Sequence, residues 1–265
     1  MKLGFIRALW GVYDHAGKSH FWARRTKIDN DIELVLHNKY MPNFKTYVFG
    51  KDNYKFLVDK GYNCQLLDDN PVVWDIDTQQ FRHKFEAFKF AAEEFDKFVF
   101  LDWDMMMIKP LPSDFWDVLA QKATLQAVMR IYHKRKAFWR GAGARTVPCG
   151  SFIYVGDKTI PIKLIEIWEQ LNKPWGEEVV MGKYTEDIMG GFTGSPEDME
   201  KYWNMFEPPY FTLQQMFPKE KMATKTPIVY HCTARAVANY LKHVNNSPKI
   251  DFDWLQKEKR DYRIS

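Results

Sequence analysis

The chain has 265 residues, of which 46% are hydrophobic and 27% are charged, enough for one large α/β domain with a sizeable core. Its formal net charge of +4 is too small to indicate a polyanionic partner unless the basic residues cluster. The cysteines are widely spaced and form no CxxC pair, which argues against a disulfide framework or a structural zinc site and favours a reducing compartment; they are Cys64, Cys149 and Cys232.

The N-terminal residues Leu3 to Tyr13 are apolar, but Arg7 interrupts them. They contain no small-residue cleavage site, and they are too short to cross a membrane. We therefore expect a soluble, cytoplasmic protein without a membrane span.

The first part of the chain alternates apolar runs with helical patterns, as expected of an α/β fold with a mostly parallel sheet. Strands are predicted at Leu3–Leu9, Ile32–Leu36, Thr46–Phe49 and Cys64–Leu67. A helix is predicted at Asn53–Lys60, with Gly61 in the usual capping position. Trp10 and Tyr13 follow the first strand, where open α/β sheets bind ligands, so they either stack on a nucleotide base or pack against the protein.

An amphipathic helix is predicted over Thr78–Phe95, because apolar residues recur there at spacings of three and four. Its first turn carries Arg82 and Lys84. A helix N-terminus with basic residues at the carboxyl edge of the sheet is a natural seat for a diphosphate. The alternative is that both side chains are solvated helix charges.

The run Phe98–Leu101 is the centre of the interpretation, because its apolar, aromatic and β-branched residues predict a strand buried on both faces. This strand ends on two carboxylates one residue apart, Asp102 and Asp104. At the carboxyl end of a parallel strand, both can reach a divalent cation that keeps positions open for substrate phosphates. That is the chemistry of a nucleotide-sugar site, whereas the alternative is a pair of solvated aspartates.

A basic interval without any Asp or Glu runs from Val118 to Gly156. It contains seven cationic residues, namely Lys122, Arg130, Lys134, Arg135, Lys136, Arg140 and Arg145. Phe138 and Trp139 lie among them. Cations with stacking rings bind phosphodiester backbones and bases, although a run of charges can also be a solvated face.

The remaining predicted elements are helices at Asp114–Ala120 and Ile162–Leu171 and strands at Thr124–Met129, Gly150–Val155 and Pro227–Tyr230. The small residues Cys149–Ser151 indicate close backbone approach to a ligand or to another strand. A helix start is predicted within Tyr184–Gly191, where Glu186 and Asp187 either cap the helix or face a reacting sugar. The last strand ends on His231, which is a metal ligand or a packed residue.

These motifs together resemble the GT-A glycosyltransferases, above all the retaining glycogenin-like and bacterial galactosyltransferase-like branch. Phe95–Asp104 is similar to that branch's "yDkvlyLDaD" segment, and Ile108–Leu111 is similar to the tail that follows it. Cys149–Val155 is similar to its "NaGvmv" strand, and Thr185–Asp187 to its "DQD" helix start. His231 is similar to its terminal metal-binding His.

The resemblance implies a single GT-A (Rossmann-like) domain over residues 1–265. The implied activity is transfer of a sugar from a nucleoside-diphosphate sugar, such as a UDP-sugar, to an acceptor hydroxyl. The residues then expected to bind the nucleotide-sugar donor are Trp10, Tyr13, Arg82, Lys84, Asp102, Trp103 and Arg235.

The resemblance also implies that Asp102, Asp104 and His231 bind Mn²⁺ or Mg²⁺ on the donor diphosphate. Glu186 is then expected near the anomeric carbon, and either it or Asp187 is the catalytic carboxylate. A bound metal neutralises the charge that develops on the departing nucleoside diphosphate.

The basic interval bears on the acceptor, because a neutral oligosaccharide gives no reason for so many cations and a polyanion does. We hypothesise that the acceptor is DNA with a hydroxylated base, bound by Lys134, Arg135, Lys136, Trp139, Arg140 and Arg145. Glycan-directed or protein-directed transfer is an alternative. Two other classes compete: a haloacid-dehalogenase-type phosphatase, which also has Asp-x-Asp after an apolar strand, and a non-catalytic nucleic-acid-binding module.

Overall fold

The structure of the protein, a computed structural model, describes residues 1–10, 39–41, 43–71, 81–102, 105–107, 110–120, 124–131, 146–172, 177–189, 211–213 and 229–231. The strands are β1 Leu3–Leu9, β2 Phe44–Phe49, β3 Cys64–Asp68, β4 Lys97–Leu101, β5 Met105–Met107, β6 Leu125–Ile131, β7 Thr146–Val155, β8 Phe211–Leu213 and β9 Val229–His231. The helices are α2 Lys51–Asp59, α3 Arg82–Glu94, α4 Phe115–Ala120, α5 Ile160–Gln170 and α6 Glu177–Met189.

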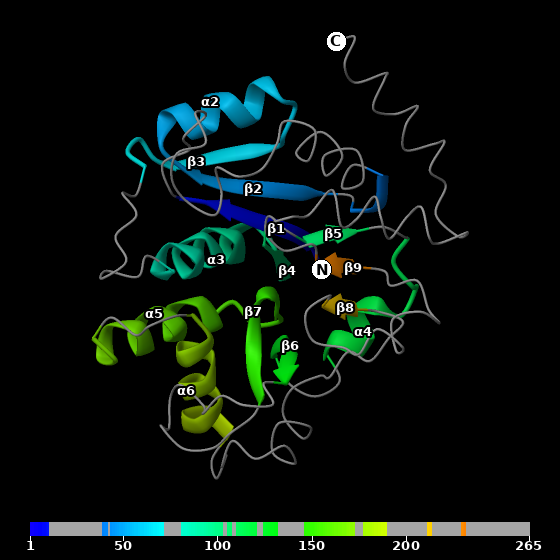
Figure 1. Cartoon of the computed structure of the whole chain (residues 1–265), viewed down its shortest axis with the longest axis vertical. Coiled ribbons are helices and arrows are strands. Elements are labelled where there is room, and N and C mark those ends of the chain that lie inside the picture. The colour runs from blue at the N-terminus through cyan, green and yellow to red at the C-terminus, as the bar shows by residue number, and fades with distance from the viewer. Residues whose placement is uncertain are drawn as a thin grey trace.

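The main sheet has six strands in the order β3-β2-β1-β4-β7-β6 (Figure 1). Strands β1 to β4 are parallel, whereas β7 is antiparallel to both of its neighbours, β4 and β6. The predicted fold class, a mostly parallel central sheet flanked by helices, is confirmed. Because β1 to β4 are parallel, their carboxyl ends meet at one edge of the sheet, which is where open α/β sheets bind ligands.

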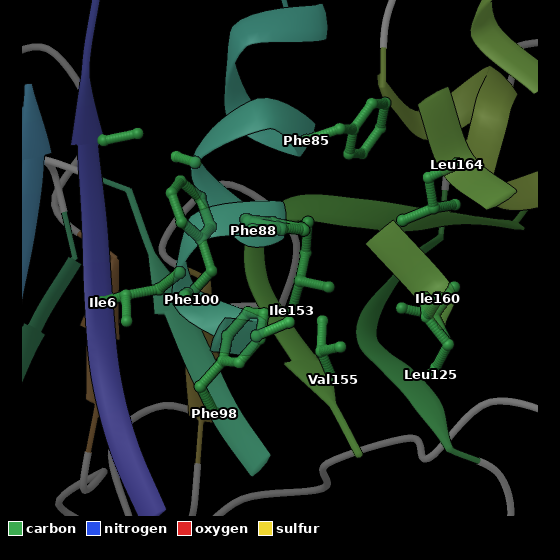
Figure 2. Close-up of a cluster of buried hydrophobic side chains, with 14 of the residues drawn as sticks. Ile6, Phe85, Phe88, Phe98, Phe100, Leu125, Ile153, Val155, Ile160 and Leu164 are labelled. Carbon is green, nitrogen blue, oxygen red and sulfur yellow. The ribbon is translucent and has the colours of Figure 1, made fainter. Parts of the chain in front are cut away.

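Helices cover both faces of this sheet, and β4 shows why. Phe98 and Phe100 point into the cluster that joins α3, α5 and α6 to one face, whereas Val99 and Leu101 point into the cluster that includes α4 on the other. On the first face the Phe88 ring of α3 packs 5.6 Å from Phe98 and 5.1 Å from Phe100, as centroid distances (Figure 2). The prediction that β4 is buried on both faces is therefore confirmed.

A second, smaller sheet has the strand order β5-β9-β8. Strand β5 begins three residues after Asp102, the residue that directly follows β4. It pairs antiparallel with β9. Neither β5 nor β8 was predicted, because strands of three residues carry too little pattern to be recognised. The small sheet connects the end of β4 to a segment from late in the chain.

Strongly periodic segments were predicted best. Strand β1 has the predicted bounds, and Gly61 ends α2 as expected, since its φ of 84° is left-handed and its N–H donates to the Val58 carbonyl at 2.9 Å. The predicted strand at Ile32–Leu36 lies outside the described residues.

The helix start predicted within Tyr184–Gly191 is wrong. Helix α6 begins at Glu177 and ends at Met189, so Glu186 and Asp187 lie in its last turn. Acidic pairs are found at both ends of this helix, and only the first pair, which begins at Glu177, occupies the end where the helix dipole favours negative charge.

Candidate functional site

Asp102 lies at the carboxyl end of β4, where backbone hydrogen bonds fix its position. Its N–H donates to the Ser151 carbonyl of β7 at 2.8 Å, and its carbonyl accepts from the Met105 N–H at 3.0 Å. The first bond extends the pairing of β4 with β7, and the second links β4 to β5. The first predicted metal ligand is therefore placed by the backbone at the edge of the sheet where ligands bind.

Lys84 reaches the Asp102 carboxylate from the first turn of α3. Its Nζ lies 3.2 Å from Asp102 Oδ1 and 2.6 Å from Glu177 Oε1. The same Nζ donates to the Gly150 carbonyl at 3.0 Å. An ammonium has three N–H donors, so these three acceptors can use all of them.

The ion cluster of Lys84, Asp102 and Glu177 is largely buried, with side chains 1%, 16% and 8% exposed, respectively. Burial alone would lower the pKa of Lys84, but the negative charges of Asp102 and Glu177 outweigh it and hold the pKa above its ordinary value. Lys84 is thus a permanent cation at neutral pH. Its ammonium contacts one oxygen of the Asp102 carboxylate. Because a carboxylate has several lone pairs, Asp102 can have further partners at the same time.

Glu177 enters the site because residue 150 is a glycine. A Cβ atom at Gly150 would lie 2.0 Å from Glu177 Oε1, so a larger residue would displace this carboxylate. The sequence indicated close approach to the backbone here, and the group that approaches is the Glu177 side chain. Sequence reasoning missed Glu177, although an acidic residue directly after the Pro and Gly of residues 174–176 is a recognised helix-start signal.

A second buried cation, Arg7 on β1, lies on the opposite face of the sheet. Its Nη2 donates to the Met105 carbonyl at 2.9 Å, and its guanidinium carbon lies 5.4 Å from the centre of the Phe44 ring. Arg7 is completely buried. Two buried cations therefore contact this part of the chain. Lys84 contacts the carboxylate of Asp102, and Arg7 contacts the backbone carbonyl of Met105.

The β5–β9 pairing brings His231 next to this connection. Met105 is the register partner of His231, and Met107 is the partner of Val229. Opposite Cα atoms in an antiparallel pair lie about 4.5–5.5 Å apart. His231, the predicted metal ligand late in the chain, thus pairs through its strand with Met105, whose N–H bonds to the Asp102 carbonyl.

The two carboxylates predicted to be catalytic, Glu186 and Asp187, are paired with a lysine of the same helix. Lys183 Nζ lies 2.7 Å from Asp187 Oδ1 and 3.9 Å from Glu186 Oε2. Nine residues separate Glu177 from Glu186, which corresponds to about 13 Å along a helix axis. The structure therefore does not bring Glu186 together with the ion cluster through α6.

Two residues predicted to bind the donor have other contacts. Arg82 forms ion pairs with Glu86 and, at 3.0 Å, with Glu169 of α5. Trp10 is only 1% exposed and packs edge-on against Phe81, with ring centroids 6.3 Å apart. Its position is that of a core residue.

Several predicted site residues lie outside the described residues: Tyr13, Trp103, Asp104, Lys134, Arg135, Lys136, Trp139, Arg140, Arg145 and Arg235. The side chain of His231 is not described either. Within the part of the chain that the structure does describe, no cluster of three or more His, Cys, Asp or Glu side chains could hold a metal ion. In the same part, no helix has the length and apolar character needed to cross a membrane.

No protein-family model and no curated protein sequence matches the chain. Solved structures with a similar fold include the apo-form glycosyltransferase GlyE of Streptococcus pneumoniae TIGR4, at 14% identity and a TM-score of 0.47, covering 87% of this chain and 54% of that one. A glycosyltransferase involved in the glycosylation of the major capsid of PBCV-1 has 14% identity and a TM-score of 0.46, covering 92% of this chain and 100% of that one.

The bifunctional glycosyltransferase WbbM has 12% identity and a TM-score of 0.49, covering 98% of this chain and 51% of that one. The chain thus spans about half the length of the GlyE and WbbM chains. At these identities the likeness is one of fold.

Proposed function

We propose that this protein is a GT-A-type glycosyltransferase that moves a sugar from a nucleoside-diphosphate sugar, such as a UDP-sugar, to an acceptor hydroxyl. The observation that supports this proposal most strongly is the pairing of Met105 with His231. It brings the strand that ends on His beside Met105, whose N–H bonds to the Asp102 carbonyl at the carboxyl edge of a mostly parallel sheet. An Asp-x-Asp motif and a late His are the pair of motifs on which the resemblance to these enzymes depends.

The proposed metal ligands are Asp102, Asp104 and His231, and the proposed metal is Mn²⁺ or Mg²⁺. Carboxylate oxygens are the ligands that hard divalent cations prefer, and imidazole suits Mn²⁺ better than Mg²⁺. The Asp102 carboxylate fits this role, because it is partly exposed at the carboxyl end of β4. When bound, the metal would neutralise the negative charge of the leaving nucleoside diphosphate.

The buried ion cluster of Lys84, Asp102 and Glu177 fixes the orientation of a proposed metal ligand. Lys84 holds the Asp102 carboxylate in one orientation, so the ligand does not have to be ordered when the metal binds. We propose Glu177, rather than Glu186 or Asp187, as the carboxylate that lies nearest the reacting sugar. Its support is that Glu177 shares the Lys84 ammonium with Asp102, whereas Glu186 and Asp187 share Lys183.

The direct test is a donor-hydrolysis screen over nucleotide sugars with Mn²⁺, Mg²⁺ and EDTA. We expect metal-dependent hydrolysis of at least one donor, and we expect Asp102→Asn to abolish it without unfolding the protein, because the substitution removes an anionic ligand and little volume. Asp59→Asn, on the exposed end of α2, is the matched control. Hydrolysis of an aryl phosphate in place of every nucleotide sugar would instead support the phosphatase alternative.

We further propose that the acceptor is a polyanion, and specifically DNA with a hydroxylated base. The support is the acid-free sequence interval with its seven cations, five of which lie between β6 and β7 in the sequence. Binding of duplex DNA should weaken steeply with salt, and charge reversal at Lys134, Arg135 and Lys136 should flatten that dependence. If neither occurs, a glycan or protein acceptor takes precedence while the donor chemistry stands.

A further inference from the structure

Arg7 occupies a position where an apolar side chain would be expected. It is in the middle of β1, the central parallel strand, and it points to the same face as Phe5 and Leu9, which are core residues. Its register partner across β2 is Thr46, which is also buried and whose hydroxyl has no hydrogen-bond partner among the described residues. Removing a guanidinium from water is costly unless hydrogen bonds replace the lost hydration. A polar pair in the interior of a sheet therefore requires a specific reason.

The Met105 carbonyl supplies that reason. Arg7 Nη2 donates to it at 2.9 Å, in a buried contact between residues that are 98 positions apart. Met105 belongs to the small sheet, and Arg7 belongs to the main sheet. The bond therefore ties β1 to β5 at the residue that also bonds to the Asp102 carbonyl and pairs with His231.

From this geometry we propose that Arg7 is a positioning residue for the metal site. It fixes the joint between the two sheets, and through that joint it sets the separation of Asp102 from His231. This inference rests on the proposed function, in which Asp102 and His231 bind the same metal ion, so that their separation affects metal binding. Arg7 itself touches neither the metal nor the substrate.

The experiment compares the full-length protein with Arg7→Met, which removes the donors at similar volume, and Arg7→Lys, which keeps a cation and a donor. Leu57→Ala is the control, because Leu57 packs with Leu9, Val48 and Tyr62 in a cluster that contains neither Arg7 nor Met105, so its loss destabilises the fold away from the joint. One readout is amide hydrogen exchange of peptides that cover β5 and β9. The other is the Mn²⁺ concentration that gives half-maximal donor hydrolysis.

We expect exchange in β5 and β9 to rise at least tenfold in Arg7→Met while β1 to β3 stay protected, with a smaller rise in Arg7→Lys. We also expect the half-maximal Mn²⁺ concentration to rise about tenfold while the rate at saturating Mn²⁺ stays within about threefold of the original. Leu57→Ala should change neither quantity selectively.

Exchange in β5 and β9 that is unchanged in Arg7→Met, or no larger than in Leu57→Ala, would overturn the inference. If Arg7→Met does not fold, Arg7→Lys decides by the same comparison. The two proposals fail differently. A protein with no metal-dependent hydrolysis at all contradicts the proposed function, whereas normal metal dependence in a folded Arg7→Met protein contradicts only the role of Arg7.

Discussion

The two edges of the main sheet use the same kinds of charged residue in opposite ways. At the amino edge, Lys2 pairs with Glu94 at 3.0 Å and Lys158 pairs with Asp96 at 3.0 Å, and both lysine side chains are more than half exposed, at 53% and 52%. At the carboxyl edge Lys84 is buried, and so is Arg7, which reaches Met105 from the middle of β1. Exposed pairs contribute little to stability, and buried charges are costly unless several partners compensate them.

The two edges therefore differ in what the loss of a charged partner costs. Lys2 and Lys158 can be replaced at little cost, because water takes the place of a partner that is lost. Lys84 and Arg7 cannot, because each buried cation is the partner of a group that would otherwise remain buried without compensation. The cost of burying these charges is consistent with a site that must hold carboxylates in fixed positions.

The largest effect is expected for Lys84→Met. Loss of the ammonium leaves Asp102 and Glu177 close together without their shared cation, which should cost about 3–5 kcal/mol in the free energy of unfolding. A urea titration measures this value. The double variant Lys84→Met with Glu177→Leu should recover part of it, and failure to recover any would mean that the ion cluster is not a coupled unit.

Gly150→Ala is expected to have the next largest effect. The new methyl group would collide with Glu177 Oε1, and the carboxylate could move away only by giving up its 2.6 Å contact with Lys84. We expect a loss of about 1–3 kcal/mol. Shortening the acidic residue in Gly150→Ala with Glu177→Asp should reduce the loss, and equal losses in the two proteins would argue against the collision.

A smaller effect concerns His83, in the first turn of α3, and it depends on pH. Burial, helped by the charge of Arg82, lowers the pKa of His83 from 6.5 to about 4, whereas the charge of Asp68 opposes the shift. The unfolded chain then binds this proton more readily than the folded protein, so the free energy of unfolding should fall as the pH falls from 6.5 toward 4.

The Glu86 carboxylate, with Oε2 2.7 Å from His83 Nδ1, also favours the charged ring. We therefore expect the free energy of unfolding to fall between pH 7 and pH 5 by only about 1 kcal/mol more in the original protein than in His83→Gln. Urea titrations of both proteins at the two pH values measure the difference. Identical pH dependence in the two proteins would show that His83 does not contribute.

The smallest effect is expected at the amino edge. Lys158→Ala removes an exposed partner of Asp96 and should leave the midpoint of a urea titration unchanged. A measurable loss would remove the contrast between the two edges, since it would mean that exposed pairs also stabilise this fold.

Local pattern was sufficient to predict much of the fold. The β4 run and the Phe85–Phe88 face of α3 are defined by neighbouring residues, and their burial followed from composition and periodicity. The position of Asp102, the first proposed metal ligand, was predicted for the same reason, because it ends a buried strand. The prediction of one domain over residues 1–265 stays a prediction.

The remaining features depend on contacts between distant residues. Glu177 is significant only because Lys84, 93 positions earlier, reaches it, and Arg7 is significant only because Met105 lies 98 positions further on. Strand β5 exists because β9 pairs with it. No local pattern contains these contacts. The helix start is a different case, because the local signal at Glu177 was missed and a start within Tyr184–Gly191 was predicted instead.

The central claim is that Asp102 and His231 bind the same divalent cation. Pulsed electron paramagnetic resonance of Mn²⁺ bound to the protein with a nucleoside diphosphate tests this claim directly, because it detects a coordinated imidazole nitrogen. We predict a nitrogen coupling that disappears in His231→Gln, and loss of Mn²⁺ binding in Asp102→Asn. Tight Mn²⁺ binding that survives both substitutions, or a nitrogen coupling that persists in His231→Gln, would contradict the account.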